Sequence, residues 1–269
     1  MPNWTRNIVF IFTILALSCT VSSPTSTQLD KESGFSSGPT HIVDSALETM
    51  EVSNLTLAEK KSRSSAVRVV RPFSEGHGSG TYMKMHGRLV VVTAAHVVEG
   101  YTVMFLREAD GTQSAARVIY KDDEADIAVL QAPELKSRVA IPYRPKKNDK
   151  NLLGAYVSYT GFPGRHELIT IRGHVASLER NMIVINMFGW FGASGSGVFD
   201  REGRFLGVVS AIDVGNIGVP IPLDSIVWVA PAWDIDEETL KIRVVTAPPL
   251  TAFNSFPGAP APRRGGPRD

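Results

Sequence analysis

The amino-acid sequence predicts an all-β fold, either a sandwich or a barrel, and two observations favour this class. Short segments rich in Val and Ile recur between residues 65 and 233 with turn-forming residues between them, a spacing typical of antiparallel strands. The same region has almost no helical periodicity and no internal repeat. The segments predicted as strands are 66–73, 87–95, 101–106, 115–120, 126–132, 155–162, 168–178, 181–187, 196–200 and 205–212.

Residues 1–23 have the layout of an export signal. One positive side chain, Arg6, precedes an apolar run over 8–17, and small polar residues follow. As a helix this run covers only about 15 Å, roughly half the hydrocarbon thickness of a bilayer, so an export signal is favoured over a membrane span. We therefore expect an exported protein, periplasmic or extracellular.

The single cysteine, Cys19, ends the apolar run in the sequence LALSC, which resembles the lipobox of bacterial lipoproteins. Two interpretations stand. In the first, Cys19 is acylated and anchors the protein to a membrane; in the second, it is a stray thiol in a signal that is cleaved near Ser22 or Ser23. In both cases the mature domain has no disulfide, so core packing must stabilise it.

The segments that flank the strand-rich region differ from it in composition. Residues 24–64 are rich in Ser, Thr and charged side chains and are predicted as a linker, although 43–61 could form an amphipathic helix. Residues 234–269 form a C-terminal extension whose Pro- and Gly-rich end, 246–269, is expected to be disordered. The formal net charge of +1 offers no concentrated basic stripe, so nucleic-acid binding is not expected.

Three local patterns point to nucleophilic catalysis. They are VVTAAHVV at 91–98 around His96, EADIAVLQ at 124–131 around Asp126, and GASGSGVF at 192–199 around Ser194. A serine hydroxyl is a weak nucleophile at neutral pH, so a neutral imidazole must take its proton, and a carboxylate must hold that imidazole in the right tautomer. His96, Asp126 and Ser194 are the residue types that this chemistry requires.

The order of these residues along the chain limits the class of enzyme. All six histidines precede Ser194, whereas an α/β-hydrolase needs its histidine after the serine and a G-x-S-x-G elbow, and position 196 is Ser. A subtilisin-like order would need an aspartate motif before His96, but Asp126 follows it. Only the order His, Asp, Ser fits.

The three patterns resemble those of the trypsin-like (chymotrypsin-fold) serine peptidases, and the disulfide-free HtrA/Deg-like branch in particular. The likeness covers roughly 165 residues and implies two antiparallel six-stranded β-barrels, barrel 1 over about 65–145 and barrel 2 over about 146–233. The supporting segments are YTGFPG at 159–164, ITIRGHVASL at 169–178, DREGRFLGVVSAI at 200–212 and GVPIPLDSI at 218–226.

This resemblance implies a serine endopeptidase that acts on protein or peptide substrates through an acyl-enzyme, with no metal and no organic cofactor. His96 is the implied general base, Asp126 orients it, and Ser194 is the nucleophile. The backbone amides of Gly192 and Ser194 are the implied oxyanion hole. Gly192 and Gly195 lack a Cβ, which lets the loop adopt the tight geometry that this hole needs.

The residues next to the three motifs are assigned structural roles, not catalytic ones. A solvated turn beside Asp126 is expected for Asp122, Asp123 and Glu124. Ser196 is the alternative candidate for the nucleophile, but it is expected to support the oxyanion loop instead. Ala193 stands where digestive proteases carry an aspartate that pairs with a freed N-terminus. That route of activation is therefore not expected here.

The candidate substrate pocket contains Phe188, Ser210 and Ala211. Phe188 stands six residues before Ser194, where trypsin-type pockets hold an acidic side chain, and Met187 and Trp190 are nearby. Because nothing negative is placed to receive Lys or Arg, we expect cleavage after a small or apolar residue.

The remaining alternatives concern domains and activity. HtrA-like enzymes usually continue into a PDZ domain, but only residues 234–269 follow Trp233, so a lone protease domain is expected and its oligomeric state stays open. Two other functions remain: a protease-fold binding module whose triad is unproductive, and an esterase or acyltransferase on the same fold.

Overall fold

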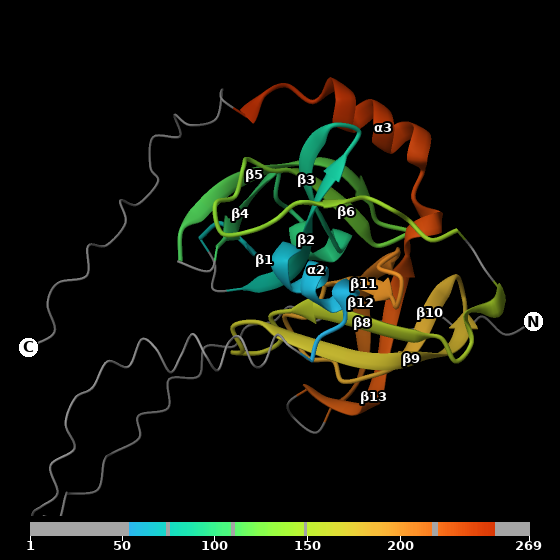
Figure 1. Cartoon of the computed structure of the whole chain (residues 1–269). Coiled ribbons are helices and arrows are strands. Elements are labelled where there is room, and N and C mark those ends of the chain that lie inside the picture. Colours follow the sequence, from blue (N-terminus) through green and yellow to red (C-terminus); the bar gives the residue numbers. More distant parts are fainter. Residues whose placement is uncertain (1–53, 74–75, 109–110, 148–149, 217–219, 251–269) are drawn as a thin grey trace, which may run out of the picture. The chain divides into compact units, whose positions relative to one another are not determined.

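The computed structural model describes residues 54–73, 76–108, 111–147, 150–216 and 220–250. The predicted export signal, Cys19 and the Pro- and Gly-rich end after residue 250 lie outside these ranges. The described strands, labelled in Figure 1, are β1 (Ala66–Val70), β2 (His77–Met85), β3 (Arg88–Thr93), β4 (Val103–Arg107), β5 (Gln113–Asp122), β6 (Ile127–Gln131), β7 (Ile141–Pro142), β8 (Tyr156–Gly161), β9 (Ile169–Glu179), β10 (Met182–Asn186), β11 (Gly197–Asp200), β12 (Phe205–Asn216) and β13 (Pro220–Pro231).

Strands β1 to β6 close into the first barrel. They follow one another in the order β1-β4-β5-β6-β3-β2, and β1 pairs back with β2, so the ring of antiparallel strands is complete. Strand β7 adds to β2 in parallel. The β2–β3 hairpin turns at His86 and Gly87, whose φ angles of 48° and 80° are both in the left-handed region that a two-residue type I′ turn requires.

Strands β8 to β13 close into the second barrel, in the order β10-β13-β12-β11-β8-β9. Its β9–β10 hairpin turns at Arg180 and Asn181, again with positive φ angles of 53° and 61°. The prediction of an all-β fold with two antiparallel six-stranded barrels is therefore confirmed, with β7 as an extra edge strand.

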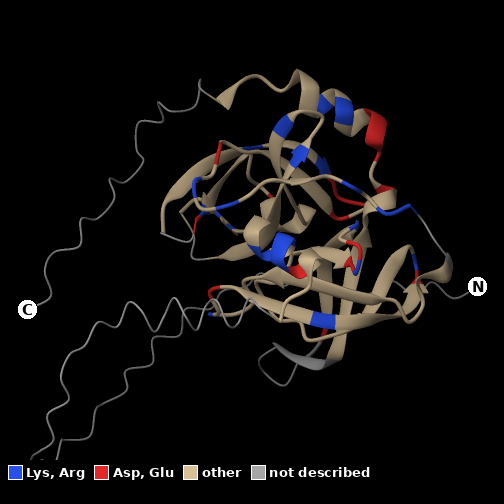
Figure 2. Cartoon of the chain, in the orientation of Figure 1, with Lys and Arg blue, Asp and Glu red and all other residues tan. Residues whose placement is uncertain are grey.

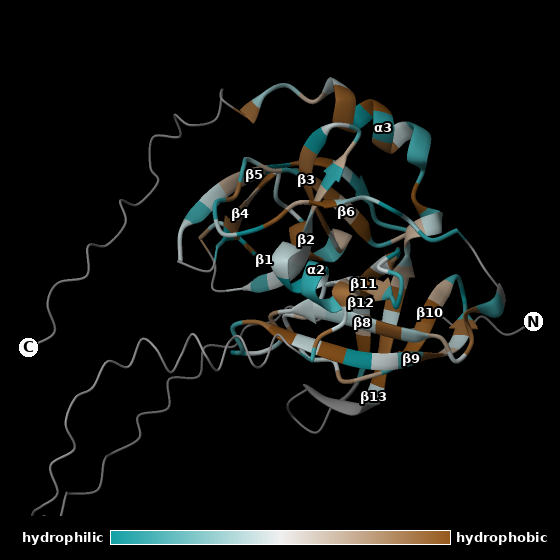
Figure 3. Ribbon diagram, in the orientation of Figure 1, coloured by the Kyte–Doolittle hydropathy of each residue, from teal (hydrophilic) through white to brown (hydrophobic). Residues whose placement is uncertain are grey.

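Each barrel has its own apolar core, and the strands carry most of the hydrophobic residues (Figure 3). Tyr82 and Met83 of β2 are almost fully buried in the first barrel, as are Tyr159 of β8 and Ile183 of β10 in the second. Each such side chain contributes about 1.5–3 kcal/mol when it leaves water. Phe205 of β12 also packs into the core cluster of the first barrel, so the two barrels share apolar contacts.

Helices flank both barrels. The short 3₁₀ turns are η1 (Ala95–Val98), η2 (Lys150–Leu152) and η3 (Ala232–Asp234). Helix α3 (Glu237–Thr246) begins at the N-cap Asp236, whose carboxylate accepts from the amides of Glu238 and Thr239. It buries Leu240 and Val244 against the core of the first barrel. Acidic residues lie in its first turn and basic residues further along (Figure 2), which complements the helix dipole.

Helix α2 (Leu57–Ser65) lies within the segment predicted as a linker, so ordered structure begins before residue 65. Its N-terminus is a capping box in which the Thr56 hydroxyl accepts from the Glu59 amide and the Glu59 carboxylate accepts from the Thr56 amide. The T-x-x-E pattern of that box is a signal that the sequence carries. Among the described residues, no helix is both long and apolar enough to cross a membrane.

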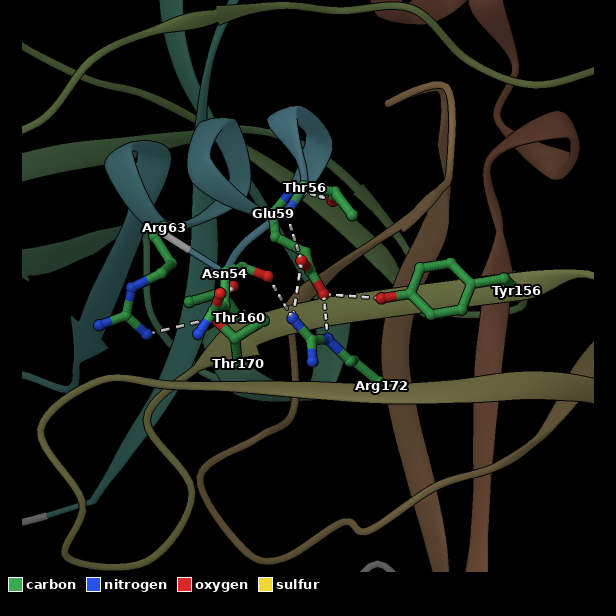
Figure 4. Close-up of polar contacts among 8 residues, drawn as sticks. All are labelled: Asn54, Thr56, Glu59, Arg63, Tyr156, Thr160, Thr170 and Arg172. Carbon is green, nitrogen blue, oxygen red and sulfur yellow. Dashed lines mark hydrogen bonds and ion pairs between the residues drawn. The ribbon is translucent and has the colours of Figure 1, made fainter. Parts of the chain in front are cut away.

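The buried carboxylate of Glu59 ties α2 to the second barrel (Figure 4). It accepts hydrogen bonds from the Arg172 guanidinium of β9 and from the Tyr156 hydroxyl of β8, the latter at 2.6 Å. Arg63, one helical turn on, donates to the Thr170 hydroxyl. Burial on its own raises the pKa of Glu59, but the hydrogen bonds from Arg172, Tyr156 and Thr56 outweigh it and lower that pKa to about 2. Because α2 runs directly into β1, this contact links the two barrels.

Candidate active site

Asp126 lies at the end of the turn between β5 and β6. Its φ of 52° is in the left-handed region, which Asp tolerates better than most residues. The turn is held by Asp122, whose carboxylate accepts from the amides of Glu124 and Ala125 at 3.0 and 2.9 Å. Asp123 pairs with Lys121 instead. Asp122 thus stabilises the turn, Asp123 pairs at its surface, and only the carboxylate of Asp126 among these three contacts the histidine.

His96 lies in η1, directly after β3, and contacts Asp126 twice. Its Nδ1 is 3.0 Å from both carboxylate oxygens, and its backbone amide donates to Oδ1 at 3.0 Å. Because a carboxylate only accepts, the proton belongs on Nδ1, which leaves Nε2 as the basic nitrogen of the neutral ring. Arg71 donates to the carbonyls of His96 and Val97 and so supports the turn from the other side, a contact that the sequence did not predict.

Ser210 of β12 donates its hydroxyl to Asp126 Oδ2 at 2.5 Å. Its hydroxyl therefore points to the Asp126 carboxylate, and a place of Ser210 in the substrate pocket stays a prediction. Asp126 thus accepts from this hydroxyl and from two nitrogens of His96, so three donors hold the carboxylate in one orientation. The contact also joins a turn of the first barrel to a strand of the second.

The loop that carries Ser194 depends on two glycines. Gly192 and Gly195 have φ angles of 93° and 85°, which side chains with a Cβ rarely adopt. A Cβ on Gly195 would lie 2.1 Å from the Thr93 hydroxyl and 2.2 Å from the Ser79 carbonyl, so no larger residue fits. Thr93 precedes His96 by three residues. The close approach therefore brings half-buried Ser194 next to the segment of the histidine.

The two amides predicted as the oxyanion hole are left available by this loop. The Phe191 carbonyl accepts from the Gly164 amide at 2.6 Å, and the Ala193 carbonyl accepts from the Ser196 amide at 2.9 Å. In a trans peptide the N–H points away from the C=O of the same unit, so each of these bonds restricts the direction of the amide in its own peptide, that of Gly192 or that of Ser194. Within the described ranges, neither amide donates to a protein acceptor.

Ser196 has no access to substrate. It is fully buried, and its hydroxyl has no hydrogen-bond partner in the described part of the chain. A Cβ on Gly161 would lie 2.0 Å from that hydroxyl, which shows how closely β8 covers it. Its amide holds the Ala193 carbonyl, in agreement with the supporting role predicted for it.

The surface beside the loop is apolar. Phe188 is 46% exposed, and its carbonyl accepts from the Tyr159 hydroxyl at 2.9 Å. Ala211 is half-buried on β12, and the next residue, Ile212, faces Gly189. A Cβ on Gly189 would lie 2.6 Å from Ile212 Cγ2 and 2.7 Å from Val227 Cγ2, so little space remains there. Among the residues with described structure, no cluster of three or more His, Cys, Asp or Glu could hold a metal ion.

Comparisons with known proteins agree with this arrangement. Residues 78–208 match the family described as trypsin-like peptidase domain. The periplasmic serine endoprotease DegP of Salmonella typhimurium is 29% identical over 181 residues, which cover 57% of this chain and 38% of that protein. DegP of Escherichia coli K12 is 31% identical over 148 residues, 50% of this chain and 31% of that protein. The chain thus spans about a third of the length of these relatives.

Solved structures share the fold. The HtrA-type protease AlgW with a tripeptide aligns with a TM-score of 0.56 and 19% identity over 69% of this chain and 62% of that chain. A serine endoprotease from Yersinia pestis aligns with a TM-score of 0.55 and 19% identity over 68% of this chain and 65% of that chain. With two closed barrels and these matches, the chain carries a trypsin-like peptidase domain of the HtrA/Deg branch.

Proposed function

We propose that this protein is a serine endopeptidase that hydrolyses peptide bonds through an acyl-enzyme on Ser194. One observation carries the proposal: the His96–Asp126 pair lies beside a glycine loop whose Gly192 and Ser194 amides have no acceptor in the described chain. The first feature supplies a general base and the second supplies donors for an oxyanion. The DegP relatives, which are named serine endoproteases, support the same activity.

In the proposed reaction, His96 Nε2 takes the proton of the Ser194 hydroxyl while Oγ attacks the scissile carbonyl carbon. The carbonyl oxygen becomes an oxyanion and accepts from the amides of Gly192 and Ser194. The imidazolium is stabilised by ionised Asp126 and then protonates the leaving amine. In the second half His96 deprotonates water, which attacks the acyl carbon; the bond to Ser194 Oγ breaks, the acid leaves, and the imidazolium returns the proton to Oγ.

We propose that the protein acts after export. The curated relatives include proteins named as periplasmic endoproteases, which supports the export signal predicted over residues 1–23. Acylation of Cys19 would add a membrane anchor to this location, and intact mass measurement of the protein from the membrane fraction tests it.

The activity is tested by offering the purified chain two substrates, denatured casein and p-nitrophenyl acetate. An endopeptidase cleaves casein into fragments and also releases nitrophenol from the ester. Turnover of the ester with intact casein would instead favour an esterase or acyltransferase, and turnover of neither would favour a silent binding module.

The apolar surroundings of Gly189 indicate which residue should precede the cleaved bond. Because the methyl groups Ile212 Cγ2 and Val227 Cγ2 lie close to the position of a Cβ on Gly189, casein fragments should end mainly in Ala, Val or similar small apolar residues. Ile212→Ala removes atoms from this pocket and should raise the share of cleavage after larger apolar residues several-fold. Mass spectrometry of the fragments measures both profiles.

Ile242→Ala is the matched control for the pocket variant, because Ile242 is 55% exposed on α3, outside the pocket. Its profile should equal that of the native protein. Cleavage mainly after Lys or Arg would contradict the pocket assignment.

A further inference from the structure

Ser79 of β2 is completely buried and makes three hydrogen bonds around the serine loop. Its hydroxyl donates to the Gly192 carbonyl at 2.7 Å and accepts from the Phe162 amide at 3.0 Å. Its backbone amide donates to the Ser194 carbonyl at 2.7 Å. The Ser79 carbonyl in turn accepts from the Thr93 hydroxyl. One residue of the first barrel thus contacts the loop of the second barrel on both sides of Ala193.

The four successive carbonyls from Phe191 to Ser194 all accept a hydrogen bond, and their donors differ in kind. The Phe191 and Ala193 carbonyls accept from backbone amides of Gly164 and Ser196, and the Ser194 carbonyl accepts from the backbone amide of Ser79. Only the Gly192 carbonyl accepts from a side chain, the Ser79 hydroxyl. This hydroxyl is therefore the one anchor of these four that a point substitution can remove without changing the backbone.

The Gly192 carbonyl also belongs to one of the two loop glycines with a positive φ. Gly192 has a φ of 93° and no Cβ, so rotation of the peptide that follows it meets little steric resistance. Such a rotation would change the angle between the Gly192 amide and the rest of the loop, including the Ser194 amide. Two hydrogen bonds on this peptide oppose it: the Gly192 carbonyl accepts from the Ser79 hydroxyl, and the Ala193 amide donates to the Trp190 carbonyl at 2.9 Å.

The second hydrogen bond of the Ser79 hydroxyl supports the same loop indirectly, through the segment from Phe162 to Gly164. It accepts from the amide of Phe162, and two residues later the Gly164 amide holds the Phe191 carbonyl. A single hydroxyl therefore fixes both the loop and the segment that supports it. If it were removed, the buried Phe162 amide and the half-buried Gly192 carbonyl would lose their partner together.

We propose that Ser79 is a positioning residue whose hydroxyl keeps the Gly192 and Ser194 amides aimed at one point. This inference rests on the proposed function, because it assumes that these amides bind the oxyanion. Ser79 does not touch substrate in this account; it acts through the Gly192 carbonyl.

The test compares the full chain with Ser79→Ala and with Ser158→Ala. Ser158 of β8 is a matched control, because it is 1% exposed and its hydroxyl has no partner in the described structure. A fluorophosphonate probe is used, since its phosphoryl oxygen takes the place of the oxyanion during reaction with the serine. Saturation kinetics separate the binding constant of the probe from the maximal rate of labelling, and casein cleavage is followed in parallel.

For Ser79→Ala, the maximal labelling rate and the casein kcat should fall about 10- to 100-fold, while the probe binding constant and KM change less than about threefold. Removing a direct oxyanion donor costs about 100- to 1,000-fold, and loss of an indirect anchor should cost less. Ser158→Ala should keep native rates. If Ser79→Ala does not fold by circular dichroism, Ser79→Cys keeps a weaker donor in the same space, and its maximal rate should also drop.

Three results would separate the two proposals. No labelling of the native chain would refute the proposed function itself. Native labelling with an unchanged rate in the folded Ser79 variant, alanine or cysteine, would refute the positioning role alone. A fall in thermal stability with unchanged maximal rate would assign Ser79 a merely structural role.

Discussion

Ser194→Ala is expected to lower casein turnover by about a million-fold, the order of magnitude typical of removing a triad nucleophile. Without the hydroxyl, no acyl-enzyme forms, and His96 and the loop amides can assist only direct attack by water. The variant should fold like the native chain, because Ser194 is only half-buried and its hydroxyl has no hydrogen bond among the described contacts. The measurement is kcat on casein, with thermal unfolding as the check on folding.

Ser196→Ala is the informative comparison, since it removes the same atom two residues further on. The Ser196 hydroxyl is buried and has no partner in the described structure, and the amide that holds Ala193 is kept. This variant should still cleave casein. Loss of turnover in Ser196→Ala with retention in Ser194→Ala would reverse the assignment of the nucleophile.

Glu59→Ala is expected to reduce the free energy of unfolding by about 3 kcal/mol, the largest stability effect that we predict for a single side chain. The change removes the acceptor of Arg172, of the Tyr156 hydroxyl and of the Thr56 amide (Figure 4). It removes the hydrogen bonds of Glu59 to β8 and β9 and opens the capping box, while the bond from Arg63 to Thr170 remains. For a domain of this size the loss corresponds to a fall of about 6–12 °C in Tm, measured by circular dichroism.

The contribution of Glu59 should also depend on pH. Folding lowers the pKa of this carboxyl from its ordinary 4.5 to about 2, so the unfolded chain binds the proton more readily. The stabilisation is therefore complete above pH 4.5 and is lost as the pH falls from 4.5 toward 2. The difference in unfolding free energy between the native chain and Glu59→Gln should shrink across that interval, because a protonated carboxyl resembles the amide.

An exposed ion pair provides the control for this effect. Glu167 is 92% exposed in its side chain and lies 3.8 Å from Arg68. Glu167→Gln should change the unfolding free energy by less than about 0.5 kcal/mol, because surface pairs are weak. An equally small effect of Glu59→Ala would contradict the proposed link between α2 and the second barrel.

Ten of the strands could be predicted from the sequence because their Val- and Ile-rich runs face an apolar core. Strand β2 could not, since its first half reads His-Gly-Ser-Gly and has few apolar residues. Close packing leaves no room for side chains at its two glycines. A Cβ on Gly78 would lie 2.7 Å from Val97, and one on Gly80 would lie 2.5 Å from Val91. Tertiary contacts thus override the local preference for a turn.

The candidate catalytic residues were easier to predict than the residues that position them. His96, Asp126 and Ser194 stand in motifs whose residue types follow from the reaction. Ser210 and Ser79 act through contacts with residues more than 80 positions away in the sequence, which no local pattern reveals. A serine beside two glycines, such as Ser79, looks like a turn until the second barrel is packed against it.

The central claim is that Ser194 is a nucleophile activated by His96 and supported by the loop amides. The most direct measurement is to react the native chain with a fluorophosphonate at neutral pH, digest it, and locate the adduct by mass spectrometry. We predict a single adduct on Ser194, absent when His96 is replaced by Ala or when the protein is unfolded in urea. An adduct on another residue, or no adduct on the folded native chain, would contradict the account.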